Sequence, residues 1–182
     1  DAMPPLPEME FALVGADHRF VSKKLQECNW AQSVEGAIDT AHFSFLHTRV
    51  GNQGASDPPT SYDQQNAWMR ADPSPRYTVQ PHDAGLILAG ARRAERGQTY
   101  WRIAQYLMPN HSYAPVGAPG QTSHGQTWVP IDDTSCWVFT YSWNAARPLA
   151  GPEREAYARG GAIHAEIGPD YVPVRRRAND YM

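Results

Sequence analysis

The chain of 182 residues has no run of about 18 consecutive apolar residues, so its sequence predicts no membrane-spanning helix. The chain contains two cysteines, Cys28 and Cys136. Two cysteines are too few for a disulfide framework or for a cysteine-rich metal site. We expect both to be reduced thiols in a cytoplasmic protein. The formal net charge of -3 gives no electrostatic reason to expect nucleic-acid binding.

Both ends of the chain look like points where a longer protein has been cut. The first ten residues are rich in proline, and they lack the basic and apolar regions of a signal peptide. They are typical of an extended linker between domains. The end, VRRRANDYM, carries no capping or turn signal. The length and the 41% hydrophobic content fit one domain. We therefore expect residues 1–182 to be most of one domain of a longer protein, with residues 1–10 as its linker.

The order of patterns along the chain predicts an α+β fold. Residues 11–14 and 19–25 have strand-like composition, whereas apolar residues spaced by three and four predict one helix from Asn29 to His47. Residues 48–66 are polar and predict a long loop. Five β-rich runs then follow, with a hairpin at 131–135, and they predict an antiparallel meander: 76–83, 84–94, 99–109, 125–133 and 134–144. A weak helix over 151–168 is broken at Gly160 and Gly161. We expect the helix to pack on one face of the sheet.

The segment EGAIDTAHFSFLH, residues 35–47, places two carboxylates and two imidazoles in an otherwise apolar run. On a regular helix Glu35, Asp39 and His42 share a face, whereas His47 is rotated from His42 by roughly 140°. Both imidazoles therefore reach one atom only if the helix ends, bends or contains a π-bulge between positions 42 and 47. Because buried charges are costly unless they are paired or bound to a metal, the pattern predicts a metal site.

The identity of the metal is left open by the spacing. Two imidazoles and one carboxylate on one side of Fe(II) are typical of non-haem iron oxygenases, and Zn(II) accepts the same ligands. Asp39 suits a ligand, and it equally suits a hydrogen-bond acceptor that fixes the tautomer of a ligand histidine. The alternative interpretation is that both histidines are core residues that bind no metal.

The run CNWAQSVEGAIDTAHFSFLH resembles the catalytic domain of Rieske non-haem iron oxygenases of the phthalate dioxygenase type. The shared motif is a carboxylate, three residues, Asp, two residues, His, four residues and His. The segments ECNW, YWRIAQYLMP, WVPIDD and RRRANDYM follow the same family in order. The resemblance implies a helix-grip fold, an antiparallel sheet packed around a helix that carries the iron ligands. It implies that His42 and His47 bind mononuclear Fe(II), and that Asp39 carries electrons from the Rieske cluster of a neighbouring subunit.

The resemblance also implies parts that this sequence lacks. A 2Fe–2S Rieske cluster needs a Cys-x-His and a Cys-x-x-His pair, and the chain has neither, so the cluster is expected in a preceding domain. The third iron ligand is expected to be an Asp beyond Met182, since neither Asp170 nor Asp180 sits in a matching motif. The implied partners are an aromatic, carboxylated substrate, O2, a reductase or ferredoxin, and further subunits in a trimer or hexamer. The chain alone is expected to be inactive.

Several further residues have candidate roles. Glu35 is a candidate hydrogen-bond partner of an iron ligand. Arg93 and Arg102, on predicted strands with Arg92, are candidates for bidentate binding of a substrate carboxylate, with ordinary surface roles as the alternative. The other histidines are expected in solvent or in turns: His18, His82, His111, His124 and His164.

Three outcomes remain open at this point. The oxygenase reaction is either dihydroxylation or a monooxygenation such as O-demethylation. A helix-grip domain can instead bind a hydrophobic ligand without a metal. A zinc hydrolase, with Asp39 or Glu35 as its general base, is the third possibility.

Overall fold

The computed structural model describes residues 7–47, 61–114 and 120–175. Most of the predicted loop, residues 48–60, lies outside them. Within these ranges, none of the helices is long and apolar enough to cross a membrane.

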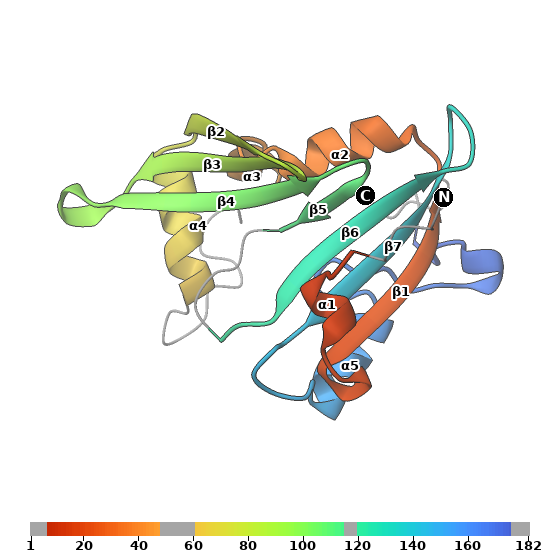
Figure 1. Ribbon diagram of the computed structural model, residues 1–182. Coiled ribbons are helices and arrows are strands. Elements are labelled where there is room, and N and C mark those ends of the chain that lie inside the picture. Colours follow the sequence, from red (N-terminus) through yellow and green to blue (C-terminus); the bar gives the residue numbers. More distant parts are fainter. Residues whose placement is uncertain (1–6, 48–60, 115–119, 176–182) are drawn as a thin grey trace.

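Seven strands form one antiparallel sheet in the order β1-β7-β6-β5-β4-β3-β2 (Figure 1). Strands β2 to β7 are neighbours in chain order, which confirms the predicted meander, and β1 lies at the edge beside β7. The strands are β1 (Arg19–Gln26), β2 (Arg76–His82), β3 (Gly85–Arg93), β4 (Thr99–Leu107), β5 (His111–Tyr113), β6 (Ser123–Pro130) and β7 (Cys136–Trp143). The three-residue β5 was not predicted, because so short a segment shows no periodicity.

The described helices are α1 (Glu10–Leu13), α2 (Trp30–Ile38), α3 (Phe43–Leu46), α4 (Ser61–Ala71) and α5 (Gly151–Ala158). Helix α2 packs against β4, β5 and β6, α4 packs against β3 and α3, and α5 packs against β1 (Figure 1). Three 3-10 turns complete the elements: η1 (Ala16–His18), η2 (Glu95–Gly97) and η3 (Pro169–Tyr171). This arrangement confirms the predicted α+β class with an antiparallel sheet.

Outside the predicted helix at 29–47, two predictions of local structure were wrong because tertiary contacts override local composition. The apolar residues 11–13 belong to helix α1 instead of a strand. The ring of Phe11 stacks on Tyr141 of β7 at 3.8 Å, and Arg19 donates to the carbonyl oxygens of Ala12 and Val14 after the last turn. The polar residues 61–66 begin helix α4 instead of ending a loop, since this helix buries Met69, Gln65 and Asn66.

The core lies between α2 and the middle of the sheet. Val34 of α2 packs with Trp128, Cys136 and Val138, and Trp30, Ala37 and Tyr106 surround this cluster. Cys136 and Cys28 are free thiols. On one face of β7, Cys136, Val138 and Ser142 are buried under α2 and the segment after α5. On the other face, Tyr141 is buried under the N-terminal segment, whereas Trp137 and Phe139 are half-buried.

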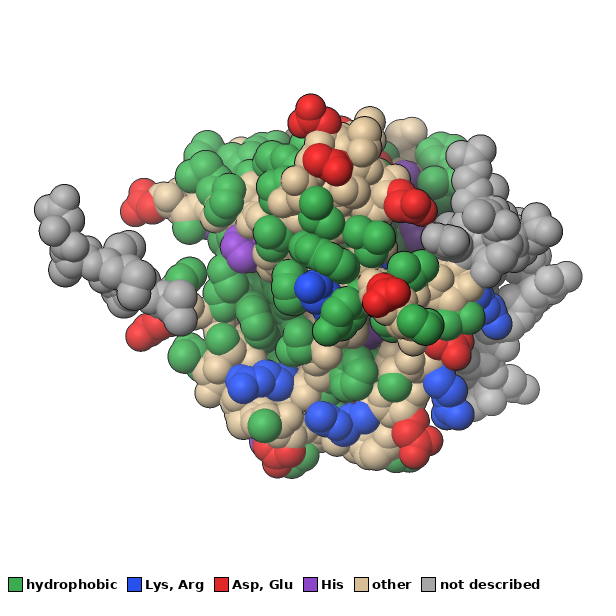
Figure 2. All heavy atoms as spheres, turned by 90° about the vertical axis from the view of Figure 1, so that its right-hand side faces the viewer, with side chains coloured by type: hydrophobic (Ala, Val, Ile, Leu, Met, Phe, Trp, Pro, Cys, Tyr) green, Lys and Arg blue, Asp and Glu red, His purple; other side chains and the backbone are tan. Residues whose placement is uncertain are grey.

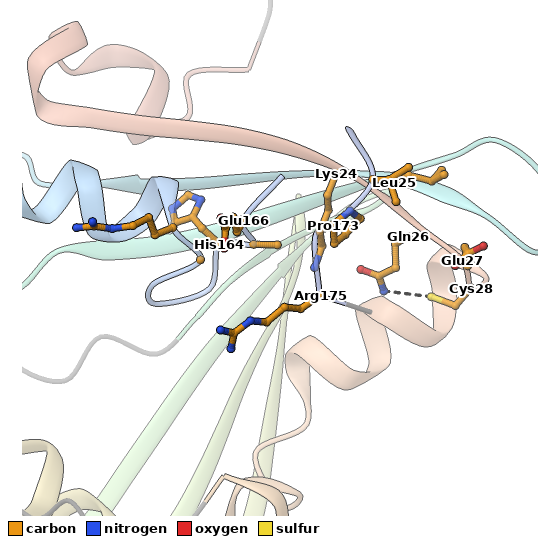
Figure 3. A pocket seen from close by; sticks show the side chains of 13 residues that line it. Lys24, Leu25, Gln26, Glu27, Cys28, His164, Glu166, Pro173 and Arg175 are labelled. Atoms are coloured by element: carbon orange, nitrogen blue, oxygen red, sulfur yellow. Dashed lines mark hydrogen bonds between the residues drawn. The ribbon is translucent and has the colours of Figure 1, made fainter. Parts of the chain in front are cut away.

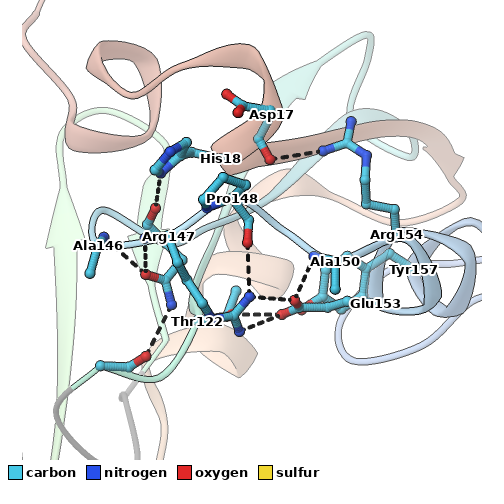
Figure 4. A network of polar contacts seen from close by, with 12 residues as sticks. Asp17, His18, Thr122, Ala146, Arg147, Pro148, Ala150, Glu153, Arg154 and Tyr157 are labelled. Atoms are coloured by element: carbon cyan, nitrogen blue, oxygen red, sulfur yellow. Dashed lines mark hydrogen bonds and ion pairs between the residues drawn. The ribbon is translucent and has the colours of Figure 1, made fainter.

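A network of polar contacts fastens α5 to the sheet (Figure 4). Arg147 donates to both carboxylate oxygens of Glu153, at 2.8 and 3.3 Å, and Thr122 and Tyr157 donate to the same carboxylate. The hydrogen bonds from Arg147 are the main cause that lowers the pKa of Glu153 to about 2. Arg154 of α5 donates to the backbone oxygen of Arg19 in β1 at 2.9 Å. These contacts hold α5 against the edge strand β1.

The molecular face at the right of Figure 1 is hydrophobic over much of its centre, with acidic and basic side chains around it (Figure 2). The exposed large hydrophobic residues on β1, the β6–β7 hairpin and the C-terminal segment are Val21, Val129, Ile131, Tyr171 and Val174. The Lys23 ammonium lies 3.8 Å from the Trp137 ring centroid and 4.7 Å from that of Tyr171. This contact ties η3 to β1 and β7.

We expect Gly125→Ala to lower the free energy of unfolding by about 1–3 kcal/mol. A Cβ at position 125 would lie 2.3 Å from Cε2 of Tyr141 and 3.0 Å from the Ser112 carbonyl oxygen, so β6 has to move away from these groups. Urea unfolding measures the effect. Gly36→Ala on α2 is the matched control, because its Cβ meets nothing within 4 Å. This control is expected to stabilise the protein by about 0.5–1 kcal/mol through helix propensity. Equal stability of the two variants would contradict the packing described for Gly125.

Candidate metal centre

The predicted helix from Asn29 to His47 is broken at Asp39. Helix α2 ends at Ile38, and Asp39 has extended backbone angles while its N–H still donates to the Glu35 carbonyl. The Asp39 carboxylate accepts from the backbone N–H of Ala41 at 2.8 Å and from that of His42 at 3.1 Å. A short side chain that bonds the next amides competes with the helix, which explains the break. Asp39, Thr40 and Ala41 therefore form a corner between α2 and α3, called here the 39–41 corner.

The two histidines flank the four-residue helix α3. His42 precedes it as the N-cap and His47 follows Leu46 as the C-cap. Their ring centroids lie 5.1 Å apart, with the planes inclined by 66°. The helix that begins after His42 ends at Leu46, before His47, and that both imidazoles reach one metal ion stays a prediction. Glu35, Asp39 and His42 do not share a helical face, because the helix stops before Asp39.

A carboxylate fixes the orientation of the first imidazole. Nδ1 of His42 lies 3.1 Å from Oδ2 of Asp39. With the proton on Nδ1 and donated to this carboxylate, Nε2 keeps the lone pair that binds a metal. Burial by itself raises the pKa of Asp39, but hydrogen bonds from Tyr77, Ala41 and His42 outweigh burial and lower the pKa to about 2. Asp39 is therefore an anionic acceptor at neutral pH.

The second imidazole is favoured in its neutral form. Burial is the main cause that lowers the pKa of His47, and the charges of His42 and Arg102 lower it further. Neutral imidazole is the form that binds a metal. Two imidazoles, one oriented by a carboxylate, fit Fe(II) or Zn(II) as part of a ligand set. Among residues 7–47, 61–114 and 120–175, no group of three or more His, Cys, Asp or Glu is placed to hold a metal. The aspartate expected beyond Met182 remains a prediction.

The histidine pair faces a cavity of about 290 Å³. This volume is close to the lower end of the range for small-molecule sites, roughly 300–1,000 Å³. His42, Phe43 and His47 line this cavity together with Ser112 of β5, Ala114 just after it, and Gly125, Gln126 and Trp128 of β6. Lys24 and Gln26 of β1 also line it.

A larger cavity of about 690 Å³ lies between β1 and the segment that follows α5 (Figure 3). Lys24 and Gln26 also line this cavity, so the two cavities share a wall. Burial lowers the pKa of the Lys24 ammonium. Figure 3 places Arg175 and Pro173 beside Lys24, with His164 and Glu166 farther along the same cavity.

The structure separates the candidate arginines. Arg102, on β4, is 8% exposed; its Nε donates to the Thr40 hydroxyl at 3.0 Å, and its guanidinium lies 4.3 Å from the Phe43 ring centroid. Arg92, on β3, is fully buried and donates to the Thr40 carbonyl at 2.6 Å. Both therefore contact the 39–41 corner. Arg93 points elsewhere: its side chain is 78% exposed and pairs with Asp72 at 3.4 Å. The geometry gives no support to substrate binding by Arg93.

Glu35 is also not brought to the histidine pair. Its side chain is exposed on α2, and the contact found to Asp39 is made by its backbone oxygen. Tyr77, on the edge strand β2, is the residue that the sequence did not suggest. Its hydroxyl donates to Oδ1 of Asp39 at 2.6 Å. No sequence signal could have found it, because Tyr77 lies far along the chain in an unremarkable strand.

Comparison with known proteins agrees with the resemblance in the sequence. A family model described as "LigXa C-terminal domain like" matches residues 1–182. The oxygenase subunit of 3-chlorobenzoate-3,4-dioxygenase from Comamonas testosteroni is 32% identical over 145 residues, which is 80% of this chain and 32% of that protein. The oxygenase subunit of phthalate 4,5-dioxygenase from Pseudomonas putida is 29% identical over 175 residues, 89% of this chain and 37% of that protein.

A solved structure shares the fold. Dicamba monooxygenase bound to 3,6-dichlorosalicylic acid aligns with a TM-score of 0.50 and 15% identity, over 85% of this chain and 48% of that chain. At this identity the likeness concerns the fold alone. The chain spans about a third of the length of the two curated relatives, 32% and 37%. Because the family model matches the whole chain, the chain belongs to the LigXa C-terminal domain-like family, and the two curated relatives that it resembles are named as dioxygenase oxygenase subunits.

Proposed function

We propose that this chain is the catalytic domain of an aromatic-ring oxygenase, in which His42 and His47 hold mononuclear Fe(II). The observation that carries the proposal is the 5.1 Å separation of the two imidazoles, one of which is hydrogen-bonded to Asp39. The names of the relatives, chlorobenzoate and phthalate dioxygenases, support a carboxylated aromatic as substrate. The site of attack, and the choice between dihydroxylation and monooxygenation, stay predictions.

The residues of the chain have distinct tasks in this proposal. Fe(II), when bound, supplies the redox chemistry that lets O2 react with an aromatic ring. His42 and His47 hold the ion, and Asp39 keeps the proton on Nδ1 of His42. Phe43 packs its ring 4.6 Å from each imidazole and limits their movement. Trp128 and Gln126 line the cavity beside the imidazoles and limit its shape. Arg102 is a weaker candidate for the substrate carboxylate, since its contacts are to Thr40 and Phe43.

The proposal includes parts outside this chain. A Rieske cluster in another domain, reduced by a reductase or ferredoxin, would supply the electrons, and Asp39 would lie between that cluster and the iron site. The side chain of Asp39 is 41% exposed, which leaves it accessible to a neighbouring surface. A trimer or hexamer and a cytoplasmic location are expected from the resemblance and stay predictions.

Iron and acid-labile sulfide in the full-length polypeptide test the proposal. A Rieske cluster plus one mononuclear iron predicts about three irons and two sulfides per chain. The double variant His42→Ala/His47→Ala is expected to lose about one iron and to keep both sulfides. His82→Ala, at an exposed histidine on β2, is the control and is expected to lose neither.

Ligand affinity and zinc content, measured on the same variants, separate the alternative functions. A metal-free binding module retains unchanged ligand affinity in the double variant, and a zinc hydrolase contains zinc without sulfide. Unchanged iron in the double variant would show that the two histidines do not bind the mononuclear iron.

A further inference from the structure

The 39–41 corner is held from three strands of the sheet. Tyr77 of β2, Arg92 of β3 and Arg102 of β4 all contact it. Thr40, at its centre, is 3% exposed, and its hydroxyl accepts from both arginines, at 3.2 and 3.0 Å. A Cβ on Gly90 of β3 would lie 2.4 Å from Cγ2 of Thr40, so the corner packs directly on the strand backbone. The position of the corner therefore depends on the strands and not on α2 alone.

The Tyr77 hydroxyl makes three hydrogen bonds to the corner. It donates to Oδ1 of Asp39 at 2.6 Å. It accepts from the backbone N–H of Thr40 at 2.9 Å and from that of Ala41 at 3.0 Å. This uses the donor and both acceptor positions of the phenol. The other carboxylate oxygen, Oδ2, is the one that lies 3.1 Å from Nδ1 of His42. Tyr77 and His42 are therefore hydrogen-bonded to different oxygens of the same Asp39 carboxylate.

We propose that Tyr77 is a positioning residue for the iron site, because its hydroxyl holds the Asp39 carboxylate in the orientation that receives the His42 imidazole. The inference rests on the proposed function and extends it to a residue of the edge strand β2. Without the hydroxyl, the buried Thr40 N–H loses its acceptor and Oδ1 loses its shortest hydrogen bond. An unpaired buried amide is costly, so the corner is expected to shift and to let water in.

The test compares Tyr77→Phe with Tyr106→Phe in the full-length polypeptide. Tyr106 also loses a hydroxyl, but its hydrogen bond goes to the Pro109 carbonyl, away from the corner. The readout is the iron retained against a graded series of a ferrous chelator. Tyr77→Phe is expected to need about tenfold less chelator than the unmutated protein to lose its mononuclear iron, and Tyr106→Phe the same amount as unmutated protein.

A double variant separates positioning through Asp39 from a general loss of structure. In an Asp39→Asn background, Tyr77→Phe is expected to cause a smaller loss of iron affinity than in the unmutated background, because part of the effect of the hydroxyl passes through the carboxylate. Additive losses would overturn the inference, and so would unchanged retention in Tyr77→Phe while His42→Ala loses its iron. If the unmutated protein holds no iron at His42, the proposed function itself fails, and the inference fails with it.

A measurement on the unmutated protein covers the case in which Tyr77→Phe does not fold. Hydrogen exchange at the amides of Thr40 and Ala41, the two donors to Tyr77, is compared between iron-loaded and iron-depleted protein. Iron is expected to slow this exchange by roughly tenfold, because metal binding stabilises the closed corner. Equal exchange in both forms would mean that the corner and the iron site are not coupled, which contradicts the inference.

Discussion

Asp39→Asn is expected to lower turnover of the full-length polypeptide by about 10–100-fold. Each oxygen of the Asp39 carboxylate accepts two hydrogen bonds: Oδ1 from Ala41 and Tyr77, and Oδ2 from the backbone and the ring of His42. Asparagine has one acceptor oxygen, so it can accept from one of these two pairs of donors. Its NH2 group would face the other pair, which also consists of donors. One of these pairs is therefore always lost, together with the negative charge beside His42.

Product formed per chain and iron retained per chain measure this effect together. Loss of iron is expected to cause part of the decrease, and a decrease that persists when iron is restored at high concentration is expected from the electron-transfer role proposed for Asp39. Glu35→Gln is the control, because the Glu35 side chain is exposed on α2, and it is expected to keep nearly full turnover. An Asp39→Asn variant with more than half of the original turnover would remove Asp39 from the mechanism.

Stability is expected to fall by about 2 kcal/mol between pH 7 and pH 5 because of His164. This histidine is 6% exposed; its Nδ1 lies 2.7 Å from the Ser22 hydroxyl and its Nε2 lies 2.8 Å from the Ser142 hydroxyl. Burial, with smaller contributions from the charges of His124 and Lys24, lowers the pKa of His164 to about 4. The rings of Phe20 and Tyr157 enclose it, at centroid distances of 4.9 and 5.1 Å.

The sign of the pH dependence follows from the proton that the unfolded chain binds. Unfolded histidine has a pKa of about 6.5, so between pH 6.5 and about 4 the unfolded state binds a proton that folded His164 excludes. The stabilisation is complete above pH 6.5 and is lost as the pH falls toward 4. Carboxylates with lowered pKa, such as Asp39 and Glu153, also contribute to the free energy of unfolding, but these contributions are lost only below roughly pH 4.5.

Urea unfolding at pH 7, 6 and 5 measures this dependence. His164→Gln keeps polar atoms near Ser22 and Ser142 but does not titrate, and it is expected to show a much smaller decrease than the unmutated protein. His82→Gln, at an exposed position, is expected to keep the original pH dependence. An equally steep decrease in His164→Gln would assign the effect to other groups, such as His124, whose pKa burial also lowers.

The histidines show which features of the site and of the core could be predicted from sequence. The sequence indicates His42 and His47 as site residues because two imidazoles and two carboxylates in an apolar run are costly to bury unless they are paired or bind a metal. His164 was expected in solvent or in a turn. Its N–H closes a turn by donating to the Gly161 carbonyl at 3.1 Å, but its side chain is buried and not in solvent. It lies in a segment of alanine, glycine and glutamate with no periodicity, and its burial depends on Ser22 and Ser142, which are distant in the chain. His124, also expected in solvent or a turn, lies in β6 and is hydrogen-bonded to the same Ser142.

The sequence by itself determined the α+β class, the order of the meander strands from β2 to β7 except the short β5, and the motif from Glu35 to His47. These features are local, since alternation and turn residues specify strands, and spacing within thirteen residues specifies the motif. The tertiary structure alone decided that the helix breaks at Asp39, that Arg102 reaches the corner while Arg93 does not, and that Tyr77 holds the carboxylate. Those contacts join α2 and α3 to strands that lie far along the chain. They are set by strand register, because a shift of one residue turns each side chain to the opposite face.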